Sequence, residues 1–302
     1  MKSYAILPRL EVKNLSRSFG NLTVVDKVSF QISSGQVTCL LGPSGCGKST
    51  TLRMIAGVET PSSGQIFVEE KLIGSTTFQV PPEARSIGLM FQDFALFPHL
   101  NVQQNVYFGL SGPKDFKQKR SFDLLKKVGL AHLAFNYPHS LSGGEQQRVA
   151  LIRALAPQPK IMLMDEPFSG LDDRLRDEIR DETFNLLRSE DTAVLMVTHD
   201  PQEAMKVADE IALMRDGKIL QKGAPYNIYN APIDLKALQF FSDANAIQAS
   251  LNGSLADTPF GQFFAPGLSD GIDIDIVFRP QHVRIDFDRN GRGPLPTASQ
   301  GV

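Results

Sequence analysis

The chain has 302 residues, of which 42% are hydrophobic and 21% are charged, and its formal net charge is -2 at pH 7. This composition is ordinary for a globular protein, and it argues against a nucleic-acid partner bound by overall positive charge. No apolar run is long enough to span a bilayer, and the N-terminus is too weakly apolar for a signal peptide. The two cysteines, Cys39 and Cys46, do not make a disulfide framework.

Between residues 10 and 91, several segments have the pattern of β-strands. Short β-branched and apolar segments within 10–34 predict the first strands, and 64–73 predicts another short pair. Two compact apolar runs, at 37–41 and 87–91, predict buried strands. Residues 93–160 then carry helical patterns with few strand signals, which predicts a helical insertion.

The sequence GPSGCGKST at 42–50 follows the strand predicted at 37–41 and precedes a helix. It fits G-x-x-x-x-G-K-[ST], a loop whose backbone amides hold phosphates at a helix N-terminus. We therefore expect Lys48 to reach the β- and γ-phosphates of a nucleotide and Ser49 to offer its hydroxyl to Mg²⁺. A further hypothesis is that this setting favours the thiolate of Cys46. The whole loop comprises Gly42, Pro43, Ser44, Gly45, Cys46, Gly47, Lys48, Ser49 and Thr50.

The region after the helical insertion alternates strands with helices. Apolar runs at 161–164 and 193–197 predict buried strands, and Asp216-Gly217 predicts a hairpin turn. Such alternation predicts an α/β core with a largely parallel sheet. Residues 243–287 predict a small β unit, and the Gly- and Pro-rich tail at 288–302 is expected to be mobile.

A second anion site is predicted at Leu141-Ser142-Gly143-Gly144-Glu145. Ser142 and Glu145 have the spacing of a capping box at a helix N-terminus. Gly143 and Gly144 cost helix stability but leave backbone amides accessible, as an anion site requires. Two anion sites about a hundred residues apart suggest that both hold one nucleotide.

The LSGGE sequence resembles the signature motif of ABC-type ATPases, and the resemblance extends from about residue 10 to residue 240. It implies an α/β fold, a P-loop NTPase core with a parallel sheet, an antiparallel β subdomain and the helical insertion. The expected domains are the ATPase at 1–240, with its helical part at about 93–160, a partial OB-like β domain at 241–287, and the tail. The family also forms a head-to-tail homodimer in which each ATP lies between the phosphate loop of one copy and the signature helix of the other.

The remaining family motifs follow in order. Asp165 ends an apolar strand, where a carboxylate can hold Mg²⁺, and Glu166 resembles the general base. Adjacent residues on a strand point to opposite faces, so we expect these two side chains to diverge. His199 matches the histidine that contacts the γ-phosphate; the catalytic set is thus Glu166, His199 and Lys48. The resemblance also gives Gln92 as a third Mg²⁺ ligand, beside Ser49 and Asp165. It gives Asp172 and the signature residues as contacts across the dimer. Phe19 is the expected aromatic that stacks on adenine, and Val24 is expected beside it.

Resemblance to ABC importers further implies membrane partners. In that group the segment after Gln92 receives a helix of the permease, which makes Phe94, Leu96 and Phe97 the expected contacts. Residues 277–283 resemble an element of the C-terminal domain in sugar, polyamine, sulfate and ferric-iron importers, and the flanks of the signature look most like the ferric-iron group. We therefore expect a peripheral subunit on the cytoplasmic face of the inner membrane, served by a periplasmic solute-binding protein.

Other readings stay open, and one of them is an importer of polyamine, sugar or sulfate. A soluble ABC ATPase acting on ribosomes or DNA is disfavoured because the chain has one cassette, no sustained heptads and no basic arm. A nucleotide-binding module without hydrolysis is disfavoured by the presence of both Glu166 and His199. The ATPase core of an exporter is disfavoured by the β element near the C-terminus.

Overall fold

The computed structural model describes residues 7–171 and 173–282, with the side chains of 173–175 and of residue 282 left aside. The chain divides into two compact units, one ending at Ala231 and the other beginning at Pro232. This division precedes the domain boundary predicted at residue 240. The predicted tail at 288–302 lies outside the described residues.

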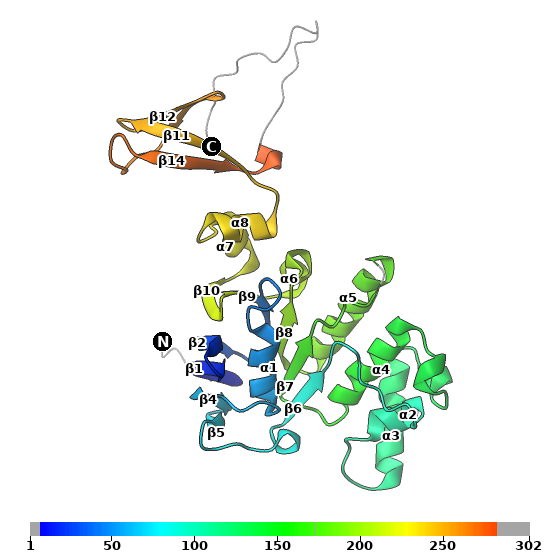
Figure 1. The fold of residues 1–302 in the computed structure, drawn as a ribbon. Coiled ribbons are helices and arrows are strands. Elements are labelled where there is room, and N and C mark those ends of the chain that lie inside the picture. The colour runs from blue at the N-terminus through cyan, green and yellow to red at the C-terminus, as the bar shows by residue number, and fades with distance from the viewer. Residues whose placement is uncertain (1–6, 172, 283–302) are drawn as a thin grey trace, which may run out of the picture. The chain divides into compact units, whose positions relative to one another are not determined.

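The centre of the first unit is a six-stranded sheet in the order β10-β9-β3-β8-β7-β6 (Figure 1). All neighbouring pairs are parallel except β10 and β9. Every residue of β3, β7 and β8 is buried, which explains why these strands read as unbroken apolar runs in the sequence. The strands are β3 (Val37–Leu41), β6 (Ile87–Met90), β7 (Ile161–Asp165), β8 (Ala193–Thr198), β9 (Glu210–Arg215) and β10 (Lys218–Gly223).

A second sheet is antiparallel, in the order β2-β1-β4-β5. Its strands are β1 (Leu10–Phe19), β2 (Leu22–Ile32), β4 (Ser63–Val68) and β5 (Lys71–Ser75). Apolar residues of β1, β2 and β4 pack with helix α1 (Lys48–Ala56) and with the parallel sheet in one hydrophobic core. This core fixes the helix that follows the glycine-rich loop.

The C-terminal end of α1 is held by an internal arginine. Arg85 follows the short turn η1 (Pro82–Ala84), and it is only 2% exposed. Its guanidinium donates to the carbonyls of Met54 at 3.1 Å and Ile55 at 2.8 Å in the last turn of α1, where the Met54 carbonyl also accepts from the amide of Gly57. A further bond to the carbonyl of Val80 at 2.7 Å ties α1 to the chain that leads into β6.

The predicted helical insertion is confirmed. It contains α2 (Val102–Tyr107), α3 (Lys114–Lys127) and α4 (Gly143–Leu155), with short turns η2 (Ala131–Leu133) and η3 (Pro138–Ser140). Figure 1 shows these helices gathered together, apart from the antiparallel strands. They share a hydrophobic core of their own, to which α2, α3 and α4 all contribute. Three more helices complete the first unit: α5 (Asp173–Ser189), α6 (Pro201–Val207) and α7 (Pro225–Asn230).

The second unit begins with α8 (Leu235–Phe241) and continues as a small antiparallel sheet in the order β13-β12-β11-β14. Its strands are β11 (Asn245–Asn252), β12 (Leu255–Thr258), β13 (Gly261–Phe264) and β14 (Asp273–Phe278), followed by η4 (Pro280–His282). These strands lie within the small β unit predicted at 243–287. Strands β12 and β13 were not predicted, because each is four residues long and much of the pair is exposed.

Candidate nucleotide-binding site

Four neighbouring strands bring the candidate residues to one edge of the parallel sheet. The order β3-β8-β7-β6 places the ends of these strands side by side, and parallel strands have their carboxyl ends at the same edge. The glycine-rich loop follows β3, His199 follows β8, and Glu166 follows β7. Gln92 comes two residues after β6 ends at Met90. Residues that are more than a hundred positions apart in sequence therefore form one cluster.

The glycine-rich loop is built around a buried lysine. The ammonium group of Lys48 donates to the carbonyls of Gly42 at 2.8 Å and Pro43 at 2.9 Å, so it lies inside the loop. Gly47 has φ 102°, and a Cβ there would come within 2.5 Å of the carbonyl oxygen of Val24. Any residue with a Cβ would be strained by this backbone angle and by the close carbonyl of Val24. The fold therefore requires glycine at position 47, independently of phosphate binding.

The thiolate hypothesis for Cys46 is wrong. Burial of this side chain raises the pKa of the thiol, and the opposing attraction of Lys48 is the smaller effect. The sulfur lies 3.8 Å from the lysine Nζ, but the lysine is already engaged with two carbonyls. Cys46 is therefore a small buried residue of the loop rather than a reactive nucleophile.

Ser49 and Asp165 form an oxygen pair at the mouth of the loop. The hydroxyl of Ser49 donates to Oδ1 of Asp165 at 2.9 Å. Asp165 is 8% exposed, and its burial raises the pKa of the carboxyl, against the effect of the Ser49 hydrogen bond. A desolvated carboxylate beside a hydroxyl suits a hard cation, and Mg²⁺ in nucleotide sites takes few protein ligands besides phosphate oxygens. The described part of the chain holds no cluster of three or more His, Cys, Asp or Glu residues that could hold a metal ion.

Glu166 and His199 meet directly. Nδ1 of His199 lies 3.0 Å from Oε1 of Glu166, and Nε2 of Gln92 lies 3.5 Å from Oε2 of the same carboxylate. The side chains of Asp165 and Glu166 were expected to point in different directions because both were placed on one strand, but the structure gives another cause. Strand β7 ends at Asp165, and Glu166 has the left-handed φ of 45° while its amide donates to Val197. This backbone turn, and not strand alternation, directs the Glu166 side chain.

A small cavity of about 120 Å³ lies beside this pair, and sequence reasoning missed two residues that line it. Thr198 and Glu203 are both buried, and the Thr198 hydroxyl donates to Oε2 of Glu203 at 2.5 Å. Burial raises the pKa of the Glu203 carboxyl. The start of α6 carried a signal for this residue: Asp200 is its N-cap, Pro201 its first residue, and Glu203 stands at the third position, where a capping box has its acid.

The predicted capping box of the signature segment is present. The carboxylate of Glu145 accepts from the backbone amide of Ser142 at 2.7 Å, and the Ser142 hydroxyl accepts from the amide of Glu145 at 3.4 Å. These bonds to Ser142 lower the pKa of Glu145. Gly143 is exposed, and nothing lies within 4 Å of where its Cβ would be. The N-terminus of α4 is thus open to an approaching group. It belongs to the helical insertion and not to the cluster at the edge of the parallel sheet, which comprises the glycine-rich loop, Gln92, Asp165, Glu166 and His199 and is called the sheet-edge cluster below.

Phe19 is an exposed aromatic at the end of β1. Phe19 is 47% exposed, so it does not pack in the core. The guanidinium of Arg17 lies over its ring at 4.6 Å from the centroid. Val24, the second residue expected near the base, is half-buried, and its backbone carbonyl oxygen lies close to Gly47. Asp172, expected at the dimer contact, lies outside the described residues.

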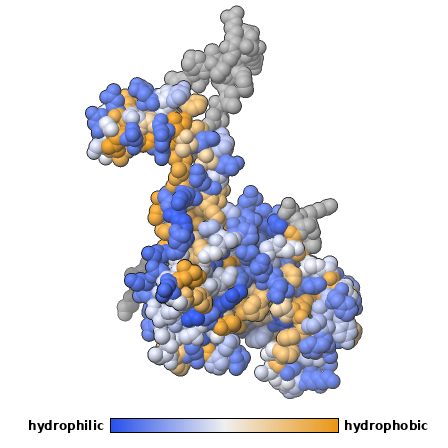
Figure 2. Space-filling model, in the orientation of Figure 1, coloured by the Kyte–Doolittle hydropathy of each residue, from blue (hydrophilic) through white to orange (hydrophobic). Residues whose placement is uncertain are grey.

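The segment after Gln92 has an unusual backbone. Phe94 and Ala95 both have positive φ, and Arg153 of α4 donates to their carbonyls at 2.9 and 2.7 Å. Leu96 packs against the core of the helical insertion. The ring centroids of Phe97 and Phe108 are 4.4 Å apart, and Phe108 is 60% exposed. Figure 2 shows further hydrophobic side chains at the surface of the helical insertion.

Comparison with known proteins gives consistent matches. The family model for "ABC transporter" matches residues 25–169. The chain is 43% identical to the Fe(3+) ions import ATP-binding protein FbpC 2 of Haemophilus influenzae, over 81% of this chain and 69% of that protein. It is 42% identical to FbpC of Pseudomonas fluorescens (95% of this chain, 82% of that protein) and 40% identical to the putrescine transport ATP-binding protein PotG of Escherichia coli (93% and 77%).

A solved structure has the same fold. It is described as the ADP conformation of MJ1267, an ATP-binding cassette of an ABC transporter, and it matches with a TM-score of 0.67 over 78% of this chain and 98% of its own. The sequence identity is 24%, so this likeness concerns the fold alone. No helix in the described ranges is both long and apolar enough to cross a membrane.

Proposed function

The chain belongs to the ABC transporter family of ATP-binding subunits, and from that premise we propose that it drives the import of ferric iron by hydrolysing ATP at the sheet-edge cluster. The hydrolysis part of the proposal is supported by the gathering of Lys48, Ser49, Asp165, Glu166 and His199 at one edge of the parallel sheet, and the iron part by the FbpC relatives. These residues supply a phosphate loop, a cation site and a paired acid and imidazole. All three parts are needed to move a phosphoryl group to water.

The roles follow from the contacts. The buried ammonium of Lys48 is placed to exchange its loop carbonyls for phosphate oxygens, which carry more negative charge. Glu166 is the base that orients and deprotonates the attacking water. His199 holds the Glu166 carboxylate through Nδ1, and in the imidazolium form its Nε2 can also donate to a phosphate oxygen.

We assign the cation site to Ser49 and Asp165, with Gln92 as a third oxygen ligand. A bound Mg²⁺ would neutralise charge on the phosphates. The contribution of the chain is to keep these ligands in place: Ser49 stands in the first turn of α1 and Asp165 at the end of β7, so both are fixed by the core. Gln92 is exposed at the entry to the helical insertion, so it links the cation site to that part of the molecule.

We also propose that the active form is a head-to-tail homodimer. The open amides at Gly143 and the capped helix at Ser142 are suited to a phosphate group. They stand on the helical insertion, apart from the sheet-edge cluster of the same chain. The partner copy would bring its signature residues, Ser142, Gly143, Gly144 and Glu145, and its Asp172 to the nucleotide of the first.

The permease contact is assigned to the segment after Gln92. Of the three predicted contacts, Leu96 contributes to the insertion core, which leaves Phe94 and Phe97 with the exposed Phe108 as the apolar contact surface. A permease helix docking there would hold the chain, as a peripheral subunit, on the cytoplasmic face of the inner membrane. A periplasmic solute-binding protein would deliver the cargo to that permease.

Uptake measurements test the cargo. Deletion of this chain in its host should lower accumulation of ⁵⁵Fe³⁺ and leave that of labelled putrescine unchanged. The wild-type chain should restore iron uptake, whereas a Lys48→Ala variant should not. Loss of putrescine uptake alone would support the polyamine reading that the PotG match suggests. If neither uptake changed, the importer proposal would be contradicted for both cargoes.

Phe19 gives a test of nucleotide binding. Phe19→Ala should weaken ATP binding about tenfold, since stacking of a base on an aromatic ring contributes on the order of 1–3 kcal/mol. Binding of inorganic triphosphate, which has no base, should be unchanged, and Phe19→Tyr should bind ATP as the wild type does. Calorimetric titration measures all of these. An equal loss of ATP and triphosphate affinity would show that Phe19 acts on the loop and not on the base.

A further inference from the structure

The turn that carries His199 is tied to the first turn of α6 by two side chains. The Thr198 hydroxyl donates to the Glu203 carboxylate at 2.5 Å and accepts from the backbone amide of Asp200 at 3.0 Å. The Asp200 carboxylate in turn accepts from the amides of Gln202 and Glu203 at 2.8 and 3.4 Å. Residues on both sides of His199 are thus hydrogen-bonded into one network with the start of the helix.

His199 itself has little else to hold it. More than half of its side-chain surface is exposed, so packing does not fix the imidazole. Among the described residues, its imidazole has a polar contact with Glu166, whose Oε1 lies 3.0 Å from Nδ1. The position of the ring therefore depends on the backbone of the 198–200 turn, and that turn depends on the Thr198 and Asp200 bonds.

Glu203 is an unusual choice for the inside of this turn. It is 6% exposed, and a buried carboxylate costs free energy unless donors satisfy it. An apolar residue of the same length would fill the space without that cost. The favourable neighbours are the Thr198 hydroxyl, Arg176 and His199. Arg176 and His199 line the same cavity of about 120 Å³ as Glu203.

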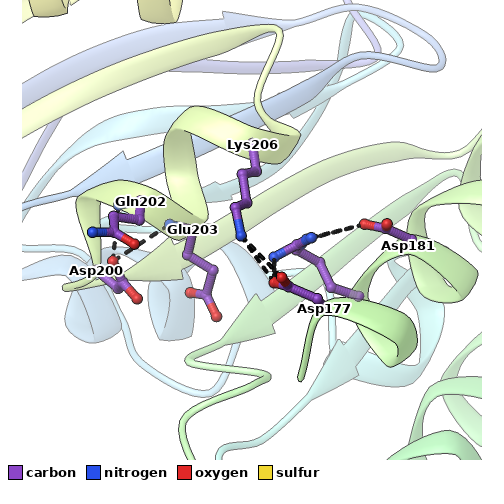
Figure 3. Close-up of polar contacts among 7 residues, drawn as sticks. Asp177, Asp181, Asp200, Gln202, Glu203 and Lys206 are labelled. Atoms are coloured by element: carbon purple, nitrogen blue, oxygen red, sulfur yellow. Dashed lines mark hydrogen bonds and ion pairs between the residues drawn. The ribbon is translucent and has the colours of Figure 1, made fainter. Parts of the chain in front are cut away.

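The outer face of the same helix is held differently. Lys206, one turn beyond Glu203, reaches Asp177 of α5 at 2.9 and 3.2 Å, and Asp177 also accepts from Arg180. Figure 3 shows Lys206 directed toward α5 and Asp200 bonded to the first amides of α6. The Lys206 pair is exposed and so contributes little to stability. This makes Lys206 a matched control on the same helix.

We propose that Glu203 is a positioning residue for hydrolysis: its buried carboxylate, acting through Thr198, holds the 198–200 turn so that His199 stays against Glu166. This proposal rests on the catalytic roles given above to Glu166 and His199. The role that it gives to Glu203 is exerted through the backbone of the turn. A displacement of the imidazole by about 1 Å is enough to lower the rate by up to two orders of magnitude.

The first experiment compares three substitutions in the full-length chain. Glu203→Met keeps the length of the side chain but removes the acceptor, so kcat for ATP should fall on the order of tenfold while the Kd for a fluorescent ATP analogue is unchanged. Glu203→Gln keeps an acceptor oxygen for Thr198 and should recover most of the wild-type kcat. Lys206→Gln should match the wild type. A folded Glu203→Met chain with wild-type kcat would overturn the proposal.

Thr198 gives the same test from the other end of the bond. Thr198→Val removes the hydroxyl at constant shape and should lower kcat as Glu203→Met does, whereas Thr198→Ser should not. This pair keeps the proposal falsifiable if Glu203→Met does not fold. In a His199→Ala background, Glu203→Met should cause no further loss, because both act through the same ring. Additive losses would show that Glu203 does not act through His199.

A measurement independent of turnover completes the test. In ¹⁵N-histidine NMR spectra, the His199 signal, identified by its loss in His199→Ala, should show one tautomer with the proton on Nδ1. Glu203→Met should average the two tautomers, and Glu203→Gln should not. If His199→Ala leaves hydrolysis intact, the proposed catalytic role of His199 fails. If His199→Ala abolishes hydrolysis but the Glu203 and Thr198 variants change neither hydrolysis nor the tautomer, the catalytic role of His199 stands and the positioning role of Glu203 fails.

Discussion

Replacement of Glu166 by glutamine is expected to lower ATP turnover about a thousandfold, within the range that general bases contribute. The glutamine side chain would have the same shape, and its amide oxygen could still accept from Nδ1 of His199, which lies 3.0 Å from Oε1 of Glu166 in the wild type. The cluster should therefore keep its geometry and bind MgATP with unchanged affinity. Only the basic carboxylate is lost.

The same variant should make the dimer visible. With ATP bound but not hydrolysed, the closed pair should persist, since the nucleotide stabilises the closed state without being consumed. Light scattering coupled to size-exclusion chromatography in saturating MgATP should report two copies for Glu166→Gln and a lower average mass for the wild type.

The control is Glu83→Gln, the same chemical change on an exposed carboxylate of η1, and it should hydrolyse ATP as the wild type does. Near-normal hydrolysis by Glu166→Gln would remove the catalytic assignment. A collapse of hydrolysis with single copies only would keep that assignment and contradict the shared-site dimer.

The second large effect is expected at the signature helix. Ser142→Arg should block hydrolysis by placing a long charged side chain over the open N-terminus of α4, where a phosphate group from the other copy would approach. Binding of ATP to the single chain should persist, because the sheet-edge cluster is untouched. A filter-binding or fluorescence titration beside an ATPase assay separates the two effects.

The protein offers a matched control for the lost helix cap. Helix α2 begins with the same kind of capping box, with Asn101 as N-cap and Gln104 three residues on. Asn101→Arg should cost about 1 kcal/mol of stability, as Ser142→Arg should, since both lose an N-cap side chain. Asn101→Arg should nevertheless hydrolyse ATP normally. If both variants lost hydrolysis to the same degree, destabilisation of the insertion would explain the result and the shared site would not.

The sequence pattern was sufficient to predict the helical insertion, but it did not reveal every strand of the second unit. The insertion was predictable because its helices have apolar stripes long enough to read and have clear breaks at Pro98, Gly112-Pro113 and Pro138. In the second unit, β12 and β13 carry four residues each, and their cross-strand partners supply the stability that their own sequence lacks. Short, exposed strands of this kind have too little periodicity to be recognised alone.

The sequence by itself determined the phosphate loop, the strands that are buried on both faces, and the capping box at Ser142, because each depends on residues within a few positions of one another. Only the tertiary structure decided the rest. Burial overruled the local charge at Cys46, a left-handed backbone at Glu166 replaced strand alternation, and Glu203 was brought under the His199 turn. The physical reason is that desolvation and hydrogen-bond partners are set by what packs around a group, which neighbours in the chain do not reveal.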